Sequence, residues 1–285
     1  MNKSVFLKDT NEFIDYFSEF ILGKSFNPKH KYKILDPKLP EGYKEMYCKD
    51  DELEINDLED AFKKYWWDNN DYNQNKEKLD QLERSIKTFH AKQDKDPNKC
   101  FELVKEVFIW GGVWNVNKRK VKEIPEKDLL SQIENGIKVM NSEEPNLDIF
   151  NKKSTRMNAG YTKYYSLACR EVIIYDGRVG AALGLMVRKF CEENNKHEVP
   201  NKLKFRWGPA RGNKIVRDPS LRNYQFIEFR GNDLKHAESN IKANWIIVEA
   251  LRRAKNKENI ITWEGKEIDI RMIEAALFTI GYSLN

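Results

Sequence analysis

Two ionisable side chains, Lys163 and Asp176, stand thirteen positions apart in a mostly uncharged stretch of a chain that is otherwise one-third charged. Lys163 lies in NAGYTKYYSLAC (158–169), and Asp176 directly precedes GRVGAALGLMVRKF (177–190). A lysine in an apolar or cationic site loses its proton near neutral pH and can attack an electrophilic carbon to form a Schiff base. A carboxylate beside it stabilises a developing oxocarbenium cation and helps to move protons. Cleavage of a base from its deoxyribose requires both kinds of group.

Each of these side chains also has a purely structural interpretation. Asp176 is suited to cap a helix that runs to about residue 194, because its carboxylate can accept hydrogen bonds from the first-turn amides. Lys163 alone is typical of a side chain with a buried stem and a solvated ammonium group. Gly160 lets the backbone turn closely into the helix of Lys163, and the second helix directs Asp176 back toward it. Together the two residues favour a catalytic site.

The segment that contains both residues resembles a known family. AGYTKYYSLACREVIIYDGRV (159–179) is similar to the helix-hairpin-helix DNA glycosylases, and most closely to their 8-oxoguanine-glycosylase-like bacterial branch, some of which act in defence against phage. In that family a Gly-rich hairpin leads into the helix of the catalytic lysine, and a catalytic aspartate heads a later helix. The resemblance implies that Lys163 is the nucleophile, that Asp176 is the essential carboxylate, and that Gly160 and Thr162 belong to a DNA-contacting hairpin.

The resemblance is specific from residue 158 to 190 and departs from the family in two respects. The hairpin reads Asn-Ala-Gly-Tyr instead of Pro-Gly-Val-Gly, and the interval from lysine to aspartate is shorter than in the better-known members. It implies a two-lobed helical bundle and a DNA N-glycosylase, a hydrolase without a dissociable cofactor that removes a modified or damaged base. Abasic-site lyase activity depends on Lys163. If the shorter interval displaces Lys163, the base would instead be released by water with Asp176 alone.

A nucleic-acid surface is predicted between residues 202 and 222, where seven cations accompany a single acid, Asp218. These cations are Lys202, Lys204, Arg206, Arg211, Lys214, Arg217 and Arg222. Guanidinium groups bind phosphate through two parallel hydrogen bonds, and the glycines of this segment allow a strand to approach the backbone. Arg178 is expected to extend this surface. The alternative is a solvated basic loop.

A glycosylase flips its target nucleotide out of the stack and holds the base between aromatic or apolar faces. The candidates for this pocket are Trp110, Trp114, Tyr161 and Trp207. Trp114 is favoured because it follows a helix stop at Gly111-Gly112, whereas aromatic residues at helical spacing more often belong to the core.

The elements that position these residues are predicted to be mainly α-helical. Apolar residues recur at helical spacing over 57–68, 76–92, 98–110, 127–141, 236–256 and 268–282, with an irregular connection at 28–55. ITWEGKEI (261–268) predicts a small hairpin with Glu-Gly at its turn. We expect an N-terminal segment (1–56), a helical lobe (57–157) and a catalytic lobe (158–285).

The composition argues against a membrane-spanning protein and against a cysteine-ligated metal site. No run approaches the roughly 18 apolar residues of a membrane span, and the four cysteines form no C-x-x-C pair or metal-ligand cluster. We expect a cytoplasmic monomer that binds double-stranded DNA with a flipped base, without a metal and without a membrane. Two alternatives remain open. One is a non-catalytic helical DNA-binding module, and the other is a nuclease, which is disfavoured because no acidic cluster suits Mg²⁺.

Overall fold

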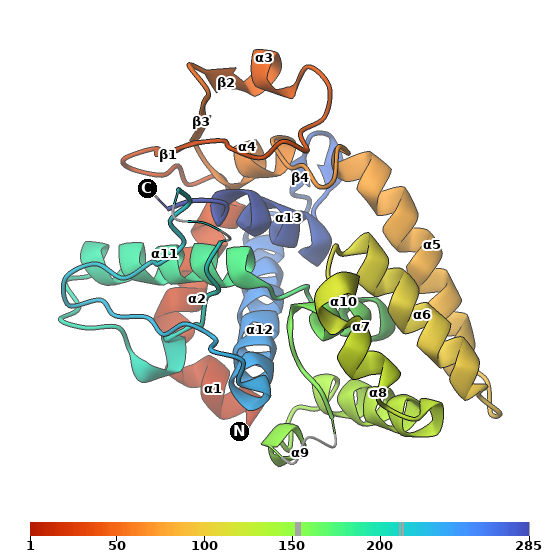
Figure 1. The fold of residues 1–285 in the computed structure, drawn as a ribbon. Coiled ribbons are helices and arrows are strands. Elements are labelled where there is room, and N and C mark those ends of the chain that lie inside the picture. Colours follow the sequence, from red (N-terminus) through yellow and green to blue (C-terminus); the bar gives the residue numbers. More distant parts are fainter. Residues whose placement is uncertain (152–154, 211, 213, 285) are drawn as a thin grey trace.

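A computed structural model describes residues 1–151, 155–210, 212 and 214–284, and it confirms the prediction of a mainly α protein (Figure 1). Only short strands accompany the helices in this part of the chain. The helices are α1 (Lys3–Asp9), α2 (Asn11–Ile21), α3 (Tyr43–Tyr47), α4 (Leu58–Lys63), α5 (Tyr72–His90), α6 (Pro97–Trp110), α7 (Trp114–Lys122), α8 (Glu126–Met140), α9 (Asp148–Asn151), α10 (Ala159–Ala168), α11 (Gly177–Glu193), α12 (Asp233–Lys257) and α13 (Ile270–Ile280), with a 3₁₀ turn at Asn201–Leu203.

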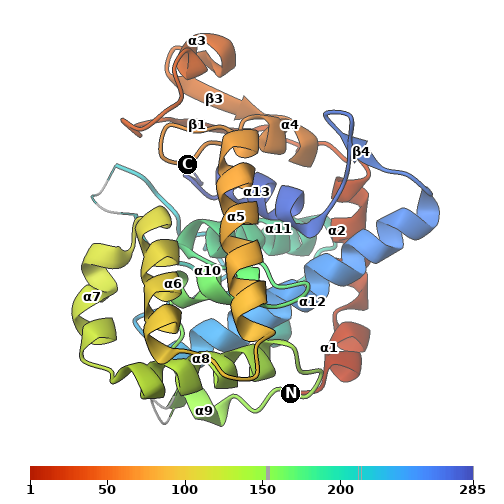
Figure 2. The ribbon, with the colours of Figure 1, turned by 90° about the vertical axis from the view of Figure 1, so that its right-hand side faces the viewer.

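The longer helices pack in two groups (Figures 1 and 2). The first contains α1, α2, α4, α11, α12 and α13, and the second contains α5, α6, α7, α8 and α10. One core of buried apolar side chains runs through both groups. Helix α4 packs on α13, and α10 packs on α5 and α6. The chain therefore crosses from the first group to the second between α4 and α5 and returns between α10 and α11.

Side-chain caps fix where α10 and α11 begin. Asn158 Oδ1 accepts from the backbone N–H groups of Gly160 and Tyr161 at 2.8 and 3.3 Å. Asp176 Oδ1 accepts from those of Arg178 and Val179 at 2.9 and 3.1 Å, which confirms the predicted cap. Such a cap typically stabilises a helix by about 1 kcal/mol. Both candidate catalytic residues consequently lie in or next to a first helical turn.

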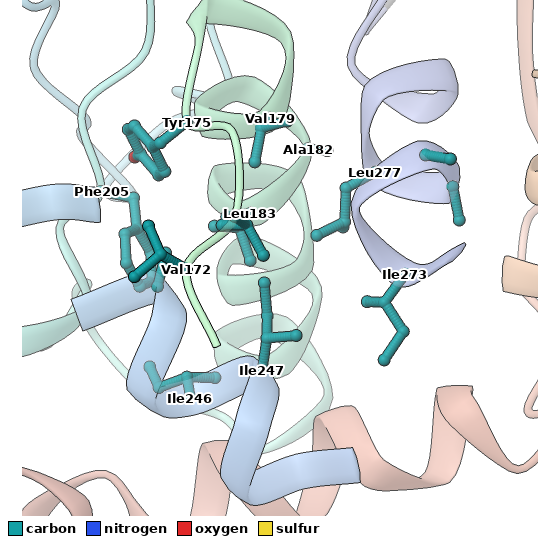
Figure 3. Packing of buried hydrophobic residues seen from close by; sticks show 14 of the residues in the cluster. Val172, Tyr175, Val179, Ala182, Leu183, Phe205, Ile246, Ile247, Ile273 and Leu277 are labelled. Carbon is teal, nitrogen blue, oxygen red and sulfur yellow. The ribbon is translucent and has the colours of Figure 1, made fainter. Parts of the chain in front are cut away.

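Helix α11 is held firmly between its neighbours. Figure 3 shows apolar side chains of α11, α12 and α13 facing a shared interior, among them Leu183, Ile247 and Leu277, all fully buried. Burial of one such side chain contributes roughly 1.5–3 kcal/mol. On another side, a Cβ at Gly180 would collide with the carbonyl oxygen of Arg206, so the loop after α11 lies directly against the helix backbone. This packing fixes the position of Asp176 at the head of the helix.

The short strands form two small antiparallel sheets. β1 (His30–Lys33), β3 (Glu52–Ile55) and β2 (Cys48–Lys49) pair in the order β1-β3-β2, within the segment expected to be an irregular connection. β4 (Thr262–Trp263) and β5 (Lys266–Glu267) form the predicted hairpin, with Glu264 and Gly265 at φ 46° and 72° in its turn. Two expectations for helices need correction, because the helix predicted over 57–68 ends at Lys63 and α7 was not predicted.

Candidate active site

A small cavity lies where the two helix groups meet, and both predicted catalytic residues line it. Lys163 comes from α10, and Asp176 from the head of α11. The other lining residues are Tyr65, Trp67, Trp110, Ile174, Val179, Glu274 and Phe278. The cavity has a volume of about 20 Å³, which is room for about one water molecule. The amine and the carboxylate are thus brought into one chamber with four aromatic side chains.

Lys163 is only 5% exposed. Its Nζ donates to the Ala159 carbonyl oxygen at 3.3 Å, and within the described part of the chain it forms no ion pair. Its stem fills the space beside Gly111, where a Cβ would collide with Lys163 Cδ. Burial lowers the pKa of Lys163, and nearby Arg178 adds to this, while Asp176 and Glu274 oppose it. The amine therefore loses its proton more readily than a lysine in water, as a nucleophile requires.

Asp176 is in a different environment, since it is partly exposed and held by amides. Both hydrogen bonds recorded for its carboxylate within the described residues go to Oδ1, so Oδ2 is left for other partners. The positive end of the α11 dipole favours a negative charge at this position. Asp176 can therefore offset positive charge that develops close to it.

Glu274 is a site residue that sequence reasoning missed. It is 8% exposed, and its Oε2 accepts from the Ile174 N–H at 2.6 Å and from Arg271 Nη1 at 2.7 Å. Arg271 Nη2 donates in turn to the Ser166 carbonyl oxygen of α10. Burial raises the pKa of Glu274, although Arg271 and the Ile174 amide oppose it. This clamp ties α13 both to the helix of Lys163 and to the segment that ends in Asp176.

His236 holds the segment that ends in Asp176 through a contact with the backbone of Tyr175. Its Nε2 donates to the Tyr175 carbonyl oxygen at 2.8 Å, and its ring stacks on Phe229 with 4.0 Å between centroids. Burial lowers the pKa of His236 to about 4, so the imidazole is neutral at pH 7. The residue before Asp176 is therefore fixed by a neutral donor. A direct phosphate contact is not its role in this arrangement.

The aromatic residues predicted to form a base pocket are separated by the structure. Trp110 lines the cavity and accepts, through its carbonyl oxygen, a hydrogen bond of 3.1 Å from Trp67 Nε1. Trp67 meets Phe278 edge-on at 5.6 Å. Neither Trp67 nor Phe278 was predicted. Both could have been suspected only from the folded arrangement, because they lie far from Lys163 in the sequence.

The other three predicted pocket residues lie outside this cavity. Trp114 begins α7 and packs edge-on against Phe101 at 6.3 Å. Tyr161 is buried and meets Phe108 edge-on at 5.2 Å. Trp207 lies in the loop after α11, where its backbone pairs with that of Glu228. The rings of Trp114 and Tyr161 thus pack on aromatic neighbours outside the cavity. The aromatic residues of the chamber are Tyr65, Trp67, Trp110 and Phe278.

The hairpin residues expected to contact DNA are inside the protein. Gly160 is buried, and a Cβ there would meet the Phe108 ring at 3.0 Å. Thr162 is fully buried, with its hydroxyl 3.2 Å from the carbonyl oxygens of both Ala159 and Tyr175. The structure does not bring either residue to the surface.

Part of the predicted basic surface is occupied by the protein itself. Arg178 is buried, with its guanidinium 4.2 Å from the centre of the Phe278 ring and its Nη2 3.6 Å from Asp36. Arg206 donates to the Glu228 carbonyl oxygen at 2.9 Å. Arg217 donates to that of Tyr282 at 3.2 Å, and burial lowers its pKa to about 10. Lys214 is exposed, and Arg211 lies outside the described residues.

Three further findings concern the whole chain. Among the residues that the structure describes, no group of three or more His, Cys, Asp or Glu side chains could hold a metal ion. In the same residues no helix is sufficiently long and apolar to cross a membrane. Comparisons with family models, curated proteins and solved structures found no match to this chain.

Proposed function

We propose that this protein is a DNA N-glycosylase that releases a modified or damaged base. The observation that carries the proposal is the chamber in which a buried lysine with a lowered pKa and a helix-capping carboxylate lie together among aromatic rings. An amine, an anion and stacking faces are the requirements of this reaction. The resemblance of residues 158–190 to helix-hairpin-helix glycosylases supports the same assignment.

The proposed reaction assigns separate roles to the two side chains. The neutral Lys163 amine attacks C1′ of the sugar while the bond from C1′ to the base breaks, and the electron pair of that bond leaves with the base. Asp176 offsets the positive charge that develops on the sugar. Opening of the C1′–O4′ bond then gives an imine, with one proton passing from the nitrogen to O4′ and the second to the departed base. Hydrolysis of the imine restores Lys163.

Burial argues against the non-catalytic alternative for Lys163. A lysine that serves only to contact phosphate would keep its ammonium group in water, where it is strongly hydrated. Lys163 instead directs its amine inside the protein, at a cost in desolvation. Such a cost is typical of lysines whose amine takes part in chemistry.

The test combines base release with chemical trapping. Duplexes that carry oxidised, alkylated, deaminated or phage-type modified bases are incubated with the protein, and the released base is measured by mass spectrometry. Borohydride reduction fixes an imine as a protein–DNA crosslink. We expect base release from at least one duplex, a crosslink with the native chain, and no crosslink with Lys163→Gln.

Lys189→Gln is the matched control, because Lys189 also lies in a helix and its pKa is also lowered by burial, yet it is not among the residues that line the cavity. This variant should keep the crosslink. Base release without any crosslink would leave an Asp176-dependent enzyme that uses water. No release from any duplex would contradict the proposed function.

A further inference from the structure

Helix α7 carries a compact set of free cations. Its exposed basic residues are Lys118, Arg119, Lys120 and Lys122, here called the α7 face. Arg119 lies 3.8 Å from Glu123, whereas in the described part of the chain the three lysines have neither an ion pair nor a hydrogen bond. In the loop after α11, Lys202 pairs with Asp9, and Arg206 and Arg217 donate to backbone carbonyls. The side chains of Lys204, Lys214 and Arg222 make no ion pair or hydrogen bond within the described residues.

The α7 face is joined directly to the candidate active site. On the buried side of α7, Asn117 Oδ1 accepts from Asn158 Nδ2 at 2.9 Å, and Asn158 caps the helix of Lys163. The turn that leads into α7 contains Gly111, which lies against the Lys163 side chain. Figure 2 shows α7 at the outer edge of the second helix group, next to α6. A ligand on α7 would thus lie close to the cavity.

A cleft continues this surface toward α10. It has a volume of about 270 Å³, and Lys120, Arg156, Asn158 and Tyr161 are among its lining residues. Lys120 therefore belongs to both the helix face and the cleft. Two apolar side chains on α6 and α7 are also unusually exposed, Ile109 at 55% and Val116 at 61%. Cations next to exposed apolar groups suit a sugar-phosphate chain, which offers both anions and carbon surface.

We propose that the α7 face binds the phosphate backbone of the DNA strand whose base enters the cavity. This inference rests on the proposed function and deepens it by placing the strand. Free lysines give up no protein partner when they bind phosphate, and each contact releases counterions from the DNA. Within residues 202–222, Lys202, Arg206 and Arg217 would first have to leave the carboxylate or carbonyl groups they hold.

The test is the triple variant Lys118→Gln, Lys120→Gln and Lys122→Gln, compared with Lys33→Gln, Lys49→Gln and Lys99→Gln. The control set is also exposed and removes the same charge. Affinity for a duplex with the preferred modified base is measured by fluorescence anisotropy over a range of NaCl concentrations. We expect the slope of log affinity against log salt to fall by roughly two to three units in the α7 variant and to stay unchanged in the control.

Base release is measured in parallel, and we expect the control variant to match the native chain there. Equal salt slopes in the two triple variants, with native base release intact, would overturn the α7 proposal alone. Absence of base release and of salt-dependent binding in the native chain would overturn the proposed function as well. Binding to phosphatidylserine vesicles that depends on the α7 lysines, without a change in DNA affinity, would also contradict the inference.

Discussion

The two sides of the cavity provide different environments for an ionisable side chain. On the α10 side, Lys163 is buried, and this burial lowers its pKa. On the α11 side, Asp176 is partly exposed, bound by two amides and placed at the positive end of a helix. One environment disfavours a charge and the other favours it. A buried amine with a lowered pKa and a carboxylate bound by amides therefore line one cavity, although each comes from a different helix group.

Among the substitutions that test this contrast, Asp176→Asn should have the largest effect on base release, because it removes the negative charge of one side of the cavity and keeps the helix cap. We expect base release in single-turnover assays to fall by about 10²–10³-fold, since a neutral amide cannot offset cationic charge on the sugar. Stability should change little, because Asn caps a helix about as well as Asp.

Asp96→Asn is the matched control for this change. Asp96 caps α6 by accepting from the Asn98 N–H at 2.9 Å, and it is not among the residues that line the cavity. Its variant should keep both stability and activity. Full activity in Asp176→Asn would reduce Asp176 to a cap and remove the charged side of the comparison.

Glu274→Gln tests the clamp that holds the two sides together. The amide can still accept from Ile174 but no longer offers a charge to Arg271, so we expect the free energy of unfolding to fall by about 2 kcal/mol. Base release should fall about 10-fold, because both catalytic groups lose a support. Urea denaturation and single-turnover kinetics measure the two effects.

Glu249→Gln provides the comparison for Glu274. Glu249 pairs with Arg252 at 2.6 Å and with Arg253 at 2.9 Å on α12, away from the cavity, and surface pairs of this kind contribute less than about 1 kcal/mol. A similar loss of stability in the two variants, with activity unchanged in both, would show that Glu274 does not position the site.

The smallest effect concerns His236, which steadies the α11 side as a neutral donor. Its pKa is lowered from 6.5 to about 4 on folding, so the unfolded chain takes up a proton first as the pH falls. The free energy of unfolding should therefore decrease by about 1.4 kcal/mol per pH unit between pH 6.5 and 4 from this group alone. Urea denaturation from pH 7 to 5 should show a shallower pH dependence in His236→Gln.

His30 separates this pH effect from the site, because burial lowers its pKa to about 4 as well and it contacts the Ile280 carbonyl oxygen at 3.0 Å. His30→Gln should flatten the pH dependence equally and leave base release intact. A pH dependence in His236→Gln that matches the native chain would mean that His236 is not neutral in the folded protein.

The helical fold was predictable because apolar periodicity covers most of the chain, and the Asp176 cap followed from one residue before a helix. The strands at 30–55 were missed because each contains four residues or fewer, too short for alternation to stand out. Helix α7 was missed because WNVNKRKVK carries only an isolated buried apolar residue, Val121, and hence no apolar stripe.

The candidate site was predictable only where sequence neighbours form it. Lys163 and Asp176 lie in one short segment, whereas Trp67 and Glu274 reach the cavity from distant elements. The lone acid in IRMIEAALFTI was the available signal for Glu274. The excess of cations in residues 202–222 was visible in the sequence. The sequence could not show which of these side chains bind carbonyl or carboxylate groups of the protein itself. That distinction requires the positions of carbonyl and carboxylate partners.

The ring of Trp110, which lines the cavity, is free of side-chain hydrogen bonds to the described residues that would oppose its rotation. Its indole N–H is buried without an acceptor among the described residues, so rotation of the ring sacrifices no hydrogen bond there. The chamber has room for about one water, so under the proposed function a nucleobase would enter only after an aromatic ring moves aside. The rate at which a base enters the cavity would then not exceed the rate at which the ring rotates. A base that stays flipped out of the duplex for longer is more often present when the cavity is open. The protein would therefore discriminate between bases first by how long each stays flipped out and then by its shape.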